Sequence, residues 1–88
     1  MATKALEYEI TETDVPVLCR LILYNSHHYW EDVIMQVQKA TGYDIIQCEQ
    51  IAVIAHTKGK AVVKSGEKIE LQKINLVLKE INLVTQIE

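Results

Sequence analysis

The feature that most constrains this chain is the run 55–63, in which a helical pattern ends at Gly59 and a strand-like pattern begins. A helix that runs through His56 and stops at Gly59 places an imidazole at a helix C-terminus, where the partial negative charge of the helix end favours a cation. Earlier in the chain, Asn25 follows the apolar run 17–24 and places a side-chain carbonyl where a strand gives way to a loop. Two acceptors at one opening would suit an ammonium group.

The composition limits the class of protein. A chain of 88 residues is large enough for one domain with a modest core. With 49% apolar and 24% charged residues, it has the composition of an ordinary globular protein. The net charge of -3 argues against a nucleic-acid partner, because phosphate binding needs a concentrated basic surface.

The sequence also indicates a compartment. No segment has the length of a membrane span, and residues 1–4 are not followed by the apolar core of a signal peptide. Cys19 and Cys48 form no CxxC pair, and both lie in apolar stretches, as small buried residues would in a reducing cytosol. We therefore expect a cytoplasmic protein without a membrane partner.

The pattern of the first half predicts an arm, a strand and a helix. Residues 1–16 are polar and acidic and end at the only proline, so we expect a flexible N-terminal arm followed by one domain over 17–88. Residues 17–24 predict a strand buried mainly on one face. A helix ending at Gly42 is indicated by apolar residues at the spacing of one helical face, namely Trp30, Val33, Ile34 and Val37.

The second half predicts two helices and two strands. Asp44 is a suitable N-cap, with Gln47 at the position that reaches back to it, for a helix over about 45–57. We expect that helix to be mostly buried, because its apolar face is broad and consists of Ile45, Cys48, Ile51, Ala52, Ile54 and Ala55. A short strand is predicted over 60–64, a turn at Ser65-Gly66, a third helix bearing Leu71, Ile74, Leu78 and Ile81, and a closing strand over 83–87.

Several of these segments resemble the ClpS family, the adaptor of the bacterial Clp protease. The resemblance depends on the run 21–25, on Val33-Ile34 and Gln38-Lys39, and above all on the run 56–61, which reads His-Thr-Lys-Gly-Lys-Ala. It spans about residues 17–88 and marks the chain as a divergent member. It implies a small α+β domain of order strand-helix-helix-strand-helix-strand, with a three-stranded antiparallel sheet covered on one face by three helices.

The resemblance also implies a function. ClpS-like proteins are not enzymes and need no cofactor; they bind substrates whose N-terminal residue is Leu, Phe, Tyr or Trp, called N-degrons, and deliver them to the N-domain of a Clp ATPase of the ClpA or ClpC type. Asn25 and His56 match the family's acceptors for the α-ammonium group. The remaining matches are Val33, which lines the family's pocket, Trp30, which approximates a bulky gate position, and Lys73, which faces the ATPase.

Four positions depart from the family pattern and predict an altered binding site. Ser26 and His27 stand where the family has two aspartates, so the loop is neutral, and it becomes cationic when His27 and the adjacent His28 are protonated. Ala52 and Ala55 replace larger residues of the family and would widen the pocket.

Alternative interpretations remain open. The chain could keep the fold and the docking surface but no longer recognise N-degrons, as the loss of both aspartates suggests. Individually, His56 could simply cap its helix, Trp30 could be a core residue, and Asn25 could be a turn residue that bonds its own backbone. A metal site at His27, His28 and His56 is less favoured, because no cysteine or acidic ligand joins them at a recognisable spacing.

Overall fold

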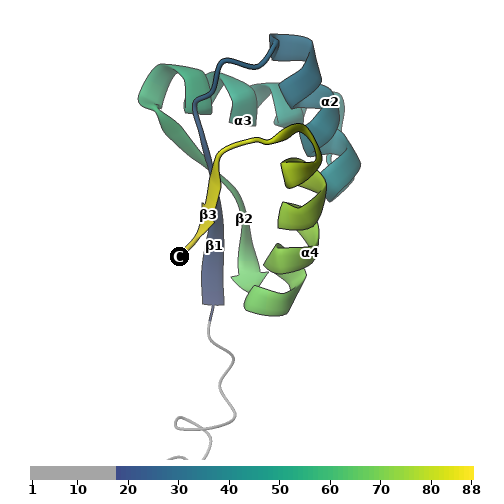
Figure 1. Ribbon diagram of the computed structural model, residues 1–88, viewed down its shortest axis with the longest axis vertical. Coiled ribbons are helices and arrows are strands. Elements are labelled where there is room, and N and C mark those ends of the chain that lie inside the picture. The colour runs from purple at the N-terminus through teal and green to yellow at the C-terminus, as the bar shows by residue number, and fades with distance from the viewer. Residues whose placement is uncertain (1–17) are drawn as a thin grey trace, which may run out of the picture.

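The structure is a computed structural model that describes residues 18–88, so the arm predicted over 1–16 lies outside the described residues. With the labels of Figure 1, the elements follow in the order β1 (Leu18–Tyr24), α2 (Trp30–Thr41), α3 (Ile45–Lys58), β2 (Lys60–Glu67), α4 (Lys68–Leu78), the 3-10 turn η2 (Lys79–Ile81) and β3 (Thr85–Ile87). This is the predicted order, and the α+β fold class is confirmed.

The sheet has the order β2-β1-β3, with both neighbours antiparallel to the central strand. Side chains alternate along β1, so that Leu21 and Leu23 enter the core that the helices cover. Ile22 points to the opposite face, where Val62 and Gln86 flank it on the two neighbouring strands. The three helices cover one face of the sheet, as expected (Figure 1).

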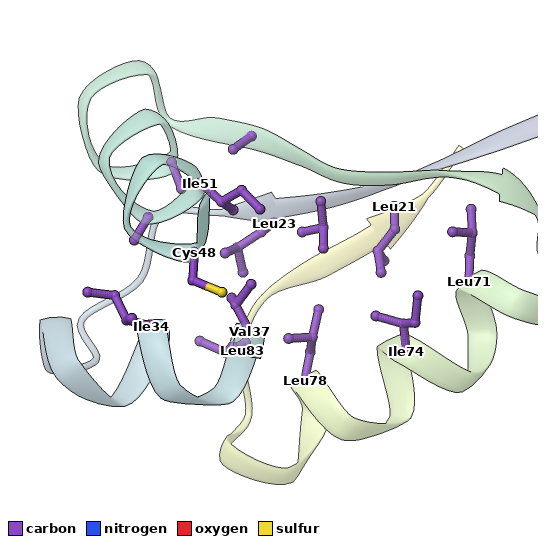
Figure 2. Packing of buried hydrophobic residues seen from close by; sticks show 14 residues of the cluster. Leu21, Leu23, Ile34, Val37, Cys48, Ile51, Leu71, Ile74, Leu78 and Leu83 are labelled. Atoms are coloured by element: carbon purple, nitrogen blue, oxygen red, sulfur yellow. The ribbon is translucent and has the colours of Figure 1, made fainter. Parts of the chain in front are cut away.

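The core lies between that face and the helices (Figure 2). Leu71, Ile74 and Leu78 extend from α4 toward the strands, and Leu78 is 0% exposed. Each fully buried aliphatic side chain contributes about 1.5–3 kcal/mol through removal from water. Cys48 from α3 lies in the same core, and burial, together with the nearby Asp44 carboxylate, raises the pKa of its thiol. Cys48 is therefore a packing residue rather than a reactive one.

The caps of α2 and α3 lie where the sequence places them. Gly42 and Gly59 end the two helices with φ angles of 78° and 91°, which glycine adopts without steric cost. Asp44 caps α3 by accepting a hydrogen bond from the Gln47 backbone N–H at 2.8 Å. These local signals therefore determine the helix ends.

Two predictions about β2 and β3 were wrong in extent. Ser65-Gly66 does not form a turn, because β2 continues to Glu67 and pairs these two residues with Arg20 and Cys19 of β1. The ladder with β1 outweighs the turn preference of serine and glycine. The closing strand is also shorter than the predicted 83–87, since β3 covers only Thr85–Ile87.

The prediction that α3 is mostly buried was wrong as well. Cys48, Ile51, Ala52 and Ala55 are buried, but the other apolar side chains of the helix are largely in solvent, namely Ile45, Ile46, Val53 and Ile54. The sheet and α2 cover one side of α3, and neither reaches around it. A helix that is apolar on most of its circumference therefore leaves an apolar strip exposed on this surface.

Candidate functional site

A hollow of about 230 Å³ lies where the loop 25–29 passes from β1 to α2, beside the C-terminal half of α3. This volume is below the roughly 300–1,000 Å³ of sites for drug-sized ligands and suits a single side chain. The lining includes all eight residues predicted for substrate binding: Asn25, Ser26, His27, Trp30, Val33, Ala52, Ala55 and His56. Three separate segments of the chain therefore meet at one opening.

Backbone hydrogen bonds hold the start of the loop on both sides. The Asn25 N–H donates to the carbonyl of Gly59 at 2.9 Å, just beyond the end of α3. The Tyr24 N–H donates to the carbonyl of Val84 at 2.9 Å, just before β3. Among the described residues the Asn25 side chain makes no hydrogen bond, so the interpretation of Asn25 as a self-bonded turn residue finds no support. Its amide is available to a ligand.

His56 and Trp30 form one rim of the hollow. Their rings meet edge to face, with centroids 6.4 Å apart and an interplanar angle of 86°. His56 is exposed in the last turn of α3, which leaves its ring nitrogens accessible. Trp30 is 43% exposed and lines the hollow rather than the core, so its alternative interpretation as a core residue is wrong. The rim thus combines an aromatic surface with a possible hydrogen-bond acceptor.

The inner wall consists of small and branched apolar side chains. Ala52 and Ala55 are buried on α3, and Val33 is half-buried in the first turns of α2. Leu23 adds the end of the central strand to the same wall. Because alanine side chains end at Cβ, the space between α2 and α3 at this level stays open.

His28 belongs to this site in a way that its sequence position did not predict, since the sequence indicated only a charge in the loop or a metal ligand. Its Nε2 donates to the carbonyl oxygen of Ile81, at the end of η2, and its Nδ1 shares a hydrogen bond with the Ser26 hydroxyl at 2.8 Å. A carbonyl only accepts, so this contact requires a proton on Nε2. His28 thereby connects the loop to a turn 53 residues away. Nothing in the local sequence signals this contact.

Two other predicted features lie differently. Lys73 is exposed on α4, a helix that contributes no residue to the hollow. Residues 18–88 contain no group of three histidine, cysteine, aspartate or glutamate side chains able to hold a metal ion, so the three histidines do not form such a group. Within that part of the chain, no helix is long and apolar enough to cross a membrane.

The hollow lies in a small α+β domain, and comparisons with known proteins identify the family of this domain. The family model described as "ATP-dependent Clp protease adaptor protein ClpS" matches residues 7–82. The match covers most of the chain, and the protein belongs to the ClpS family. It is accordingly an adaptor of the Clp protease, and membership implies contact with Clp protease components and with substrates. The match also begins within the segment predicted as an arm.

A solved structure shows the same fold. It is titled "The structure of Agrobacterium tumefaciens ClpS2 bound to L-phenylalaninamide" and superimposes with a TM-score of 0.72 at 22% sequence identity. The alignment covers 84% of this chain and 100% of that one. A comparison with curated protein sequences gave no match.

Proposed function

We propose that this protein is a non-enzymatic adaptor that binds the N-terminal residue of a substrate in the hollow and delivers the substrate to a Clp ATPase. The observation that carries the proposal is the convergence of Asn25, His56 and the two alanines on one opening. The relative from Agrobacterium supports it, because L-phenylalaninamide combines a free α-amino group with an aromatic side chain. The proposed place of action is the cytoplasm, with the ClpA- or ClpC-type N-domain as partner.

The chemistry requires two contacts. The α-ammonium group would donate to the Asn25 side-chain carbonyl and to a neutral His56 ring, and the N-terminal side chain would enter between Val33, Ala52 and Ala55. Hydrogen bonds to a charged group contribute about 1.5–3 kcal/mol each, enough to distinguish a free amine from a blocked one. Because His56 must be neutral to accept, binding weakens as the pH falls and the ring gains a proton.

The competing proposal is an adaptor that docks on the ATPase without reading N-degrons. It is favoured by the loop 25–29, which contains no carboxylate to attract an ammonium group. In that case the hollow would be an unused remnant of the fold.

One titration separates the two proposals. Peptides that begin with Leu or Phe are added while the fluorescence of Trp30, the only tryptophan, is followed and heats are measured by calorimetry. The first proposal expects saturable binding that is lost with N-acetylated peptides and falls about tenfold or more in Asn25→Ala. Absence of binding by both methods would contradict it and leave docking as the function.

Docking is tested independently on α4. Lys73→Glu reverses the charge of the residue assigned to the ATPase, and Lys68→Glu makes the same change at another exposed position of the same helix. We expect Lys73→Glu to weaken the complex with a ClpA- or ClpC-type N-domain and Lys68→Glu to leave it near its original strength. Equal effects of the two changes would count against a role specific to Lys73.

A further inference from the structure

The loop that lines the candidate site is also the wall of a second hollow. This hollow has a volume of about 430 Å³ and is lined by the four loop residues 25–28 and by Val84. Val84 is half-exposed, and its carbonyl accepts the Tyr24 N–H, which fixes it beside the loop. The two hollows therefore share the loop 25–28, with Trp30, Val33 and α3 belonging to the first and Val84 to the second.

The shared loop bears on the path of a bound peptide beyond its N-terminal residue. A ligand whose ammonium group is held at Asn25 and whose first side chain occupies the first hollow has its next Cα only about 3.8 Å further along. Among the described residues, those that line both hollows are Asn25, Ser26, His27 and His28, so the second hollow adjoins the first along the loop. A second ligand residue at this distance would lie near the loop that both hollows share.

The two histidines of the second hollow differ in whether they are free to contact a ligand. His28 is occupied by Ser26 and Ile81, whereas exposed His27 makes no hydrogen bond or ion pair with any described residue. The loop 25–29 carries no carboxylate. The adjoining elements also carry charged groups. At the junction of α3 and β2 these are His56, Lys58 and Lys60, and in the first turn of α2 they are Glu31 and Asp32. In η2 they are Lys79 and Glu80, and Glu80 is paired with Lys39.

We propose that the second hollow is a subsite for the second residue of the substrate and that His27 makes it selective for an acidic side chain there. This inference rests on the proposed function, because it requires a peptide N-terminus in the first hollow. A protonated imidazole attracts a carboxylate and repels an ammonium group. At an exposed position such a pair changes an affinity by only about two- to fivefold. His27 is accordingly a specificity residue rather than the anchor of the ligand.

The test compares three peptides that begin with Leu and differ only at the second residue, which is Glu, Gln or Lys. Calorimetry at about pH 6 should give affinities in the order Glu, Gln, Lys, with Glu about two- to fivefold tighter than Gln. At about pH 8 the ratio should approach one, because the imidazole loses its charge. Loss of the His56 acceptor is common to the three peptides and cancels in the ratio, whereas any attraction of Glu by a His56 charge would persist in a variant that lacks His27.

Two variants test which residue supplies the positive charge that favours Glu at the second position. His27→Asn should bring the Glu-to-Gln ratio at about pH 6 close to one. Lys58→Gln, which removes a cation next to the same end of α3, should preserve the ratio. If Lys58→Gln abolishes the ratio, or His27→Asn leaves it intact, the assignment to His27 is overturned.

The outcomes for this inference and for the proposed function are distinct. Binding of the Gln peptide with a ratio of one at both pH values, or a preference for Lys, would overturn the acidic subsite and leave N-terminal recognition standing. If none of the three peptides binds, both the subsite and the proposed function are overturned.

Discussion

The two ends of the helical layer differ in how they fill the space above the sheet. Beside α4, Leu71, Ile74 and Leu78 extend to the strands and leave the core closed (Figure 2). Beside the C-terminal half of α3, Ala52 and Ala55 face the same sheet and leave a hollow. Short side chains at Ala52 and Ala55 accompany the hollow, whereas long ones at α4 accompany the closed core.

The largest effect is expected at the closed end. Leu78→Ala removes a fully buried side chain and should lower the free energy of unfolding by about 2–5 kcal/mol, because it adds a cavity to the lost burial. Urea denaturation measures this change. Leu76→Ala, on the exposed side of the same helix at 72% exposure, should change stability by less than about 0.5 kcal/mol. Similar losses in the two variants would mean that the closed end is not the stability centre.

The next largest effect on stability compares a substitution in the packed core with the same substitution at the wall of the hollow. Ala61→Val enlarges a buried residue of β2 that does not line the hollow, and overpacking should cost about 1–3 kcal/mol. Ala55→Val adds the same two methyl groups at the wall of the hollow and should cost less than about 1 kcal/mol, including the lower helix propensity of valine. Peptide titrations should show that Ala55→Val weakens binding of N-terminal Phe more than that of Leu. An equal cost at both positions would contradict the open hollow.

The loop provides a matched pair of neighbouring histidines. His28→Ala removes two hydrogen bonds to Ser26 and Ile81 and should cost about 0.5–1.5 kcal/mol for each bond lost. His27→Ala removes an exposed ring without such contacts and should leave stability within about 0.5 kcal/mol of the original. Thermal melts of both variants check this difference. Equal stabilities would show that His28 does not hold the loop in solution.

The smallest effect concerns the exposed ion pair that connects α2 to η2. Lys39 Nζ donates to Glu80 Oε1 at 2.7 Å, and this bond, followed by one from Gln36, lowers the pKa of Glu80 from its usual 4.5. A lowered pKa in the folded state contributes stability above pH 4.5 and loses it as the pH falls through the lowered value. Glu80→Gln should therefore reduce Tm slightly at neutral pH.

Melting curves recorded across the acid range check this pH dependence. The difference in Tm between Glu80→Gln and the original chain should shrink below pH 4.5. Glu49→Gln, on the exposed side of α3, makes no ion pair with a described residue and should give no such pattern. A difference that stays constant with pH would show that the pair contributes nothing through ionisation.

Much of the candidate site was predictable because its residues lie in short, recognisable runs. The position of Asn25 after the first strand and of His56 before Gly59 follows from local patterns, and the family resemblance added Trp30, Val33 and the two alanines. The part that His28 plays was not predictable. Its partner Ile81 is far away in the sequence and contributes only a backbone carbonyl, which every residue has. The binding roles of Asn25, His56 and the other predicted site residues stay predictions.

The sequence by itself determined the order of the elements and the ends of α2 and α3, because caps, glycines and helical spacing act within a few residues. Only the tertiary structure decided how far β2 runs, since Ser65 and Gly66 join the strand through their partners on β1. It likewise decided which side of α3 is buried and which two hollows share the loop 25–28. These features depend on neighbours distant in sequence, and no local pattern carries that information.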